Sequence, residues 1–146
     1  ENAEYMRYGV MHRNSYLNSP RCLTSHYSLK ERPDLFFAGQ ITGVEGYIES
    51  TASGFLAGYY AGLLSVGKTD IFEPTGNTAI GSMALYVSDP SIRHFQPMNA
   101  NHGIMSPIAG KFRGKTGKKD RNRALADRSL EEIEQMRGFI KTISNR

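Results

Sequence analysis

The sequence predicts an α/β fold in which a short apolar strand leads through a glycine-rich turn into a helix. The strand is the apolar run 35–38, and the turn occupies residues 39–46. Residues 47–65 then follow helical spacing, with three glycines recurring at every fourth position from Gly54. A glycine weakens a helix by roughly 1 kcal/mol relative to alanine. We therefore expect these glycines to lie against a sheet or a neighbouring helix.

The segments around the apolar run have the composition of short strands and turns. Residues 5–17 and 22–29 are rich in strand-forming side chains, and residues 18–20 and 31–34 contain the proline and polar residues typical of turns. The apolar run itself is short and uninterrupted. That pattern is typical of a strand covered on both faces, so we expect it to be buried.

Two more helices are predicted in the second half of the chain. One begins near Asn77 or Thr78, either of which can cap it. Residues 93–110 have no periodic pattern and are expected to be irregular. The last helix is expected to begin at about Ser129, which forms a capping-box pattern with Glu132. Its apolar stripe is Leu130, Ile133, Met136, Ile140 and Ile143.

Length and composition suit one domain that is part of a longer protein. The chain has 146 residues, 39% of them hydrophobic, and begins at Glu1 without an initiator methionine. We therefore expect a piece of a larger chain. The least polar stretch, 46–66, contains Glu49 and is a poor membrane span.

Few residues have the pattern of a catalytic or metal site. The single cysteine, Cys22, excludes an internal disulfide, fits a cytoplasmic protein, and is better explained as an incidental thiol than as a nucleophile. The four histidines lack metal-ligand spacing, which predicts no metal. Three serines considered as nucleophiles, Ser19, Ser50 and Ser53, lack the strand-to-helix turn that a nucleophilic serine occupies.

The glycine turn is a candidate cofactor site. Cofactors bind at the carboxyl ends of strands in open α/β sheets, and a helix N-terminus offers free N–H groups to an anionic ligand. The glycines at 39, 43 and 46 do not have the dinucleotide spacing G-x-G-x-x-G. A purely structural turn between strand and helix therefore remains an alternative interpretation.

The excess of positive over negative charge lies in one segment. Residues 111–128 contain eight Lys and Arg against two Asp, while the net charge of the whole chain is +4. Such a segment predicts contact with RNA phosphates, and a solvated surface is the alternative. The candidate RNA-binding residues are Lys111, Arg113, Lys115, Lys118, Lys119, Arg121 and Arg123.

Three motifs in a fixed order resemble one known family. Residues 38–50 resemble a signature of the Gid family of tRNA-modifying flavoproteins, and residues 5–14 and 95–101 resemble its folate-dependent methyltransferase branch. The carboxymethylaminomethyl-uridine branch shares the first motif only, and it remains an alternative. A non-catalytic RNA-binding module is a further alternative.

The resemblance implies a fold and a division of the chain. The family's flavin-binding domain is a glutathione-reductase-like, three-layer Rossmann-like domain. Residues 1–67 would be its C-terminal segment, and residues 68–146 would be a helical C-terminal extension containing the basic segment.

The resemblance also implies an activity and its ligands. The full-length enzyme would use FAD, methylenetetrahydrofolate and NAD(P)H to form ribothymidine in the T-loop of tRNA. The implied FAD residues are Gly39, Gln40, Ile41, Thr42, Gly43, Val44, Glu45 and Gly46, with Gln40 on the flavin ribitol. Three residues near the folate are implied, His12, Arg13 and Asn14. The partners would be tRNA, the folate donor and the rest of the parent chain, with no membrane.

This chain alone is expected to be inactive. The family's ADP-binding loop and its proposed cysteine nucleophiles lie upstream of these motifs, so no catalytic residue is assigned here and the isolated chain should not retain FAD. A valine at Gly43 is expected to block the approach of the turn to the flavin while the protein stays folded.

Overall fold

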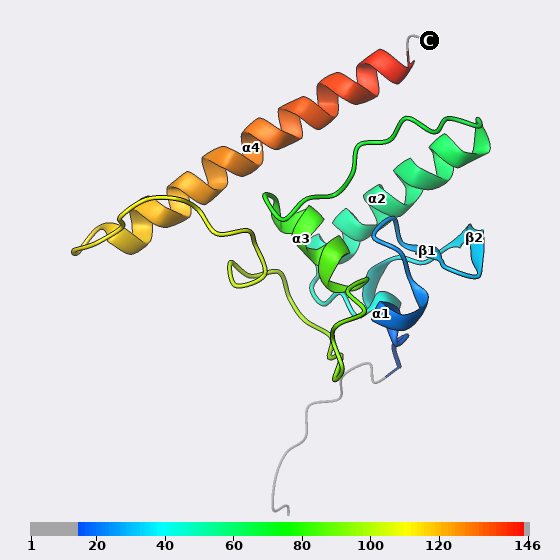
Figure 1. Ribbon diagram of the computed structural model, residues 1–146, viewed down its shortest axis with the longest axis horizontal. Helices are drawn as coiled ribbons and strands as arrows, with labels where there is room; N and C mark the ends of the chain where they lie inside the picture. The colour runs from blue at the N-terminus through cyan, green and yellow to red at the C-terminus, as the bar shows by residue number, and fades with distance from the viewer. Residues whose placement is uncertain (1–14, 145–146) are drawn as a thin grey trace, which may run out of the picture.

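The structure, a computed structural model, describes the backbone of residues 15–144 and the side chains of residues 15–142 (Figure 1). Within this range, short strands lie in the first third and helices make up most of the remainder. The elements in chain order are α1 (Ser19–Cys22), β1 (Ser28–Leu29), β2 (Arg32–Phe36), the 3₁₀ turn η1 (Gly39–Thr42), α2 (Tyr47–Ser65), α3 (Ala79–Tyr86) and α4 (Gly117–Ser144). Strands and helices together agree with the predicted α/β class.

The sheet within residues 15–144 consists of β1 and β2, paired antiparallel. Residues 22–29 were expected to form a strand, but β1 covers only Ser28–Leu29. The predicted polar turn at 31–34 is also displaced, because Arg32–Phe36 already forms β2. A local irregularity between Ser28 and Leu29 accompanies this tight connection.

The apolar run 35–38 is not buried on both faces, so that prediction is wrong for this chain. Leu35 is 41% exposed, and Ala38 is exposed as well. The reason is that β1 is the only strand paired with β2 in the described part of the chain. One edge of β2 and much of its apolar surface therefore face outward.

Helix α2 buries one face and leaves its glycine face open. Leu56, Ala57 and Tyr60 belong to the core. A Cβ atom built on the glycines at 54, 58 and 62 would meet no atom within 4 Å. The expected close approach to these glycines is therefore not made by any described residue. Exposed apolar side chains lie on the same helix or just after it, namely Tyr47, Ile48, Phe55, Leu64 and Val66.

Helix α3 begins where the sequence predicted. The side chain of Thr78 accepts a hydrogen bond from the N–H of Gly81 at 2.9 Å, which caps the helix N-terminus. Met83, Ala84 and Val87 are buried against α2 and the segment that contains Phe95. As predicted, residues 93–110 contain no helix or regular strand.

Helix α4 begins at Gly117, twelve residues before the predicted start. The capping-box prediction is wrong: Ser129 lies inside the helix and donates to the carbonyl oxygens of Leu125 and Asn77, both at 2.8 Å. Lys, Arg, Ala and Leu favour helices, and they extend α4 through the basic segment. The predicted stripe is only partly right, because Met136 is buried while Leu130 is 65% exposed.

Hydrogen bonds from Arg128, Ser129 and Glu132 attach α4 to the remainder of the chain. Glu132 accepts hydrogen bonds from Thr75 and from the amide of Asn77. Arg128 donates to the carbonyl oxygens of residues 106 and 107. Figure 1 shows α4 running alongside the segment that connects α2 with α3. No helix between residues 15 and 144 has the length and apolar character needed to cross a membrane.

Candidate functional site

The glycine turn is a closed, internally hydrogen-bonded loop. Gly39, Gly43 and Gly46 have φ angles of 73°, 85° and 90°, a region that residues with a side chain rarely adopt. The hydroxyl of Thr42 donates to the carbonyl of Gly39 at 2.7 Å, and the N–H of Gly43 donates to the carbonyl of Gln40 at 3.0 Å. The three glycines thus allow the chain to reverse between β2 and α2.

Groups from outside the turn fix its position. The hydroxyl of Ser53 accepts from the N–H of Gly39 at 2.7 Å, and the hydroxyl of Ser19 donates to the carbonyl of Thr42 at 2.8 Å. The N–H of Leu17 donates to the carbonyl of Ile41 at 2.8 Å. Both serines lack the sequence pattern of a nucleophile, and no local pattern in the sequence indicates these long-range bonds.

The motif at residues 95–101 lies directly against the turn. Val44 and Met98 form a parallel bridge, in which the N–H of Met98 donates to Gly43 and the N–H of Glu45 donates to Met98, both at 3.0 Å. The carboxylate of Glu49 accepts from the N–H of Ala100 at 3.3 Å. Two motifs separated by about fifty residues in the sequence therefore form one site.

The glycine at position 43 is required by Phe95. A Cβ atom at Gly43 would lie 2.3 Å from Cζ of Phe95, whose ring is buried between those of Tyr16 and Tyr86. At Gly46 it would meet the side chain of Glu49. Packing inside the chain therefore gives Gly43 a second reason to be glycine, beside the expected approach to a ligand, which stays a prediction. No local pattern in the sequence indicates that Phe95 makes this glycine necessary.

The groups that remain open to a ligand lie at the edge of the turn and the start of α2. The side chains of Gln40 and Glu45 are exposed, and Tyr47 and Ile48 are 92% and 84% exposed. No described side chain caps the N-terminus of α2. Free N–H groups and the helix dipole suit an anionic group, and the Gln40 amide can donate to or accept from a hydroxyl. These groups fit FAD, which carries a polyol and phosphates.

A cavity of about 350 Å³ adjoins the first turn of α2. Its walls are mostly apolar, with Ile48, Ala52 and Met83 among them, and Glu49 and Thr78 add polar groups. Burial raises the pKa of Tyr27, another wall residue, so its phenol stays protonated. The cavity is large enough to accept part of a planar ligand beside the turn.

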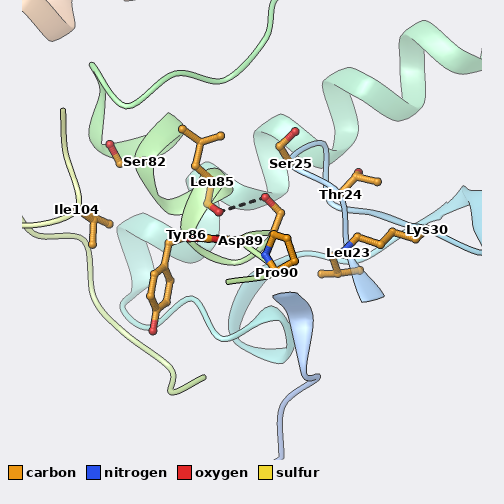
Figure 2. Close-up of a pocket in the computed structure, with 11 residues that line it drawn as sticks. Leu23, Thr24, Ser25, Lys30, Ser82, Leu85, Tyr86, Asp89, Pro90 and Ile104 are labelled. Carbon is orange, nitrogen blue, oxygen red and sulfur yellow. Dashed lines mark hydrogen bonds between the residues drawn. The ribbon is translucent and has the colours of Figure 1, made fainter. Parts of the chain in front are cut away.

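A second cavity, of about 670 Å³, lies away from the glycine turn. Figure 2 shows Thr24, Ser25 and Lys30 on one side of it and Leu85 and Asp89 on the other. Its charged groups, Lys30 and Asp89, already have hydrogen-bond partners within the chain. The Lys30 ammonium donates to the carbonyl of Pro20 at 2.8 Å. Hydrogen bonds from Ser91 hold the pKa of Asp89 below its ordinary value.

Several residues singled out from the sequence lie elsewhere. His12, Arg13 and Asn14 are outside the described residues. Cys22 is half-buried, and its thiol donates to the carbonyl of Asn18 at 3.3 Å. Within residues 15–142, no three His, Cys, Asp or Glu side chains gather as they would around a metal ion.

The seven basic residues predicted to contact RNA are all exposed. Those at 111, 113 and 115 lie in the loop before α4, and those at 118, 119, 121 and 123 lie in its first two turns. None of them forms a salt bridge with a described residue. Their charges are therefore available to a polyanion.

Residues 1–69, which include the strand, the turn and α2, match the family described as glucose inhibited division protein A. That family is the class of protein to which this strand, glycine turn and helix belong.

Curated relatives narrow the class. The chain is 53% identical over 133 residues to a methylenetetrahydrofolate–tRNA-(uracil-5-)-methyltransferase TrmFO of Lacticaseibacillus paracasei, covering 91% of this chain and 29% of that protein. It is 48% identical over 145 residues to the protein of the same name from Lactiplantibacillus plantarum, and the match covers 99% of this chain and 32% of that protein. It is 52% identical over 134 residues to the protein of the same name from Bacillus cytotoxicus, and the match covers 92% of this chain and 30% of that protein. The chain belongs to the TrmFO family, and it spans about a third of the length of these relatives.

Proposed function

We propose that this chain is part of an FAD- and methylenetetrahydrofolate-dependent tRNA methyltransferase that forms ribothymidine in the T-loop. The observation that carries the proposal is the similarity of almost the whole chain to proteins of that name. Nothing in the comparisons favours the carboxymethylaminomethyl-uridine branch. The activity belongs to the full-length protein, which would be cytoplasmic, and this portion alone would be inactive.

The proposed role of residues 39–46 is to hold the flavin half of FAD. FAD supplies hydride chemistry when it is bound, methylenetetrahydrofolate supplies the one-carbon unit, and NAD(P)H is the reductant. In this chain the Gln40 amide would bond a ribitol hydroxyl, and the free N-terminus of α2 would stabilise negative charge by about 0.3–1 kcal/mol. The closed hydrogen bonding of the turn supports this role because it presents these groups in a fixed position.

Residues 12–14 are proposed to contact the folate, and they lie outside the described part of the chain. Leu17, which follows them closely in the sequence, is hydrogen-bonded to Ile41 in the glycine turn. This proximity in the sequence supports a folate site close to the flavin turn.

The open face of α2 is proposed to pack against the remainder of a three-layer flavin domain. A Cβ atom built on its glycines would meet no atom of another described segment within 4 Å, and Phe55 beside them is 55% exposed. Glycines allow two backbones to approach closely, and buried apolar area stabilises such a contact. The unpaired edge of β2 would continue the sheet. On this proposal residues 1–67 complete the flavin domain and residues 68–146 form its helical extension.

The basic segment is proposed to bind tRNA. The exposure of all seven predicted cations and the lack of salt bridges from them to described residues support this role. Each cation that neutralises a phosphate should contribute roughly 0.7–0.9 to the slope of log affinity against log salt.

The function is tested with purified full-length protein. We expect flavin absorbance in the protein, and ribothymidine in an unmodified tRNA transcript when methylenetetrahydrofolate and NAD(P)H are supplied. Omitting the folate donor should abolish the product. Protein without flavin, or flavoprotein that makes no ribothymidine, would contradict the proposal.

The RNA surface is tested by charge removal. Alanine at Lys115, Lys118, Lys119 and Arg121 together should weaken tRNA binding and lower the salt slope by about three to four. The control replaces Arg137 and Lys141, exposed cations at the other end of α4, and should leave the slope unchanged. Equal slopes for both variants would assign the basic segment to ordinary solvated surface.

A further inference from the structure

A third cavity lies beneath the basic end of α4. Its volume is about 470 Å³, and we call it the Asn122 pocket. Residues of α4 form one wall and the loop 100–105 forms the other, with Ala79 of α3 at the base. Met105 and Leu125 are buried and give the pocket an apolar floor.

The polar groups around this floor suit the edge and face of a nucleobase. The Oδ1 atom of Asn122 is buried and has no hydrogen-bond partner within the described structure. An unpartnered buried polar atom is costly, and a ligand that bonds it removes that cost. His102 is exposed at the pocket wall, where its ring can stack on a base. A side-chain amide offers both a donor and an acceptor to a base edge.

Positive charge stands beside the same opening. Lys118 precedes Asn122 by four residues in α4, so the two side chains lie one turn apart on the same face of the helix. Lys118 is exposed and forms no salt bridge with any residue between 15 and 142. A phosphate attached to a nucleoside in the pocket would therefore lie within reach of its ammonium group.

The pocket also adjoins the cavity at the start of α2. The two share Ala79, Ala100 and Ser129 in their walls. The cavity at the start of α2 continues to Ile48 and Glu49, next to the glycine turn. The two cavities thus connect the basic end of α4 with the proposed flavin site.

We propose that the Asn122 pocket binds one unstacked nucleotide of the RNA substrate. The amide of Asn122 bonds the edge of the base, the apolar floor and His102 contact its faces, and Lys118 contacts its phosphate. An unpaired base can be turned out of a stack at low cost, so the pocket selects RNA with a loop over a continuous duplex. This inference rests on the proposed RNA-binding function of the basic segment.

Two substitutions test the pocket in the full-length protein. Asn122→Leu removes the amide and replaces an unpaired polar atom with an apolar side chain. Ala126→Trp fills the pocket from its exposed rim. Each should weaken binding of an unmodified tRNA transcript roughly tenfold, with an unchanged salt slope. Gln135→Trp, at an exposed position of α4 outside the pocket lining, is the matched control.

Two further readouts separate recognition from a structural role. Binding of a fully paired RNA duplex of the same length should be unaffected by either pocket variant. The thermal stability of Asn122→Leu should stay level or rise, whereas a structural amide would lose stability on replacement. A folded Ala126→Trp protein that binds tRNA with wild-type affinity would overturn the proposal that the Asn122 pocket binds a nucleotide. If charge removal in residues 115–121 also leaves tRNA binding unchanged, the proposed RNA surface itself fails.

Discussion

The glycine turn and the basic segment were both predicted to bind a ligand, and the structure gives them opposite environments. The turn is hydrogen-bonded internally and to Ser19, Ser53 and Met98, so most of its groups have partners within the chain. The cations of the basic segment are exposed and form no salt bridge with a described residue. A substitution in the turn therefore acts first on the fold, whereas one in the basic segment acts first on a binding partner.

The two regions also require their residues for different reasons: the glycine turn needs side chains that fit its packing, and the basic segment needs positive charge. Gly43 is determined by the ring of Phe95 that occupies the place of its missing side chain. Lys115, in the loop before α4, contributes a charge whose effect falls off over a Debye length. The turn is thus a site of fixed geometry, and the basic segment a site of summed charge.

The largest effect is expected for Gly43→Val. The φ angle of 85° costs a residue with a side chain about 1–2 kcal/mol, and the overlap with Phe95 adds about 1–3 kcal/mol. The free energy of unfolding should therefore fall by about 2–5 kcal/mol. Thermal and denaturant unfolding of the full-length protein measure this loss, and flavin absorbance follows it.

Gly39→Ala is the matched control for this variant. Its φ angle of 73° carries a similar conformational cost, but its Cβ would lie 3.8 Å from Cβ of Ser50, an ordinary contact. The loss should be about 1–2 kcal/mol. A Gly43→Val protein as stable as Gly39→Ala would show that Phe95 moves aside freely. In that case the sequence-based expectation would hold, namely that Gly43→Val stays folded and loses flavin.

A middle-sized effect is expected where the basic helix joins the fold. Glu132→Ala leaves the donors of Thr75 and Asn77 without their acceptor and should cost about 2 kcal/mol. Glu134→Ala removes only an exposed 3.4 Å ion pair with Arg137 and should cost less than about 0.5 kcal/mol. Hydrogen exchange of α4 measures both. Equal protection in the two variants would mean that Glu132 does not attach the helix.

Local patterns predicted the elements whose determinants are close in the sequence. The cap at Thr78, the irregular segment 93–110 and the helix after the glycine turn all agree with the structure. Each depends on side-chain chemistry within a few positions, such as a hydroxyl that bonds an N–H three residues later.

The parts that were missed depend on contacts across the chain. Ser129 and Glu132 have the spacing of a capping box, but their partners are Asn77 and Thr75. The burial of the run 35–38 was overestimated because only one strand pairs with β2 in residues 15–144. The turn was recognised by its glycines, while its support by Ser19, Ser53 and Phe95 had no local signature.

The smallest effect concerns single charges at the two ends of α4, and it has opposite signs. Lys118 lies in the first turn, where the partial positive charge of the helix N-terminus disfavours a cation. Lys118→Ala should therefore raise the free energy of unfolding by about 0.3–0.5 kcal/mol at low salt. Lys141 lies in the last turn, where a cation is favoured, so Lys141→Ala should lower it by a similar amount. Both differences should shrink at 1 M salt, where the Debye length is about 3 Å. Denaturant unfolding at two salt concentrations measures them. If the basic segment serves RNA binding, Lys118→Ala stabilises the free protein and weakens its complex with tRNA. A fall in the free energy of unfolding of more than about 1 kcal/mol for Lys118→Ala would instead mean that this lysine makes contacts within the native chain. The start of α4 would then resemble the glycine turn, whose groups have partners within the chain.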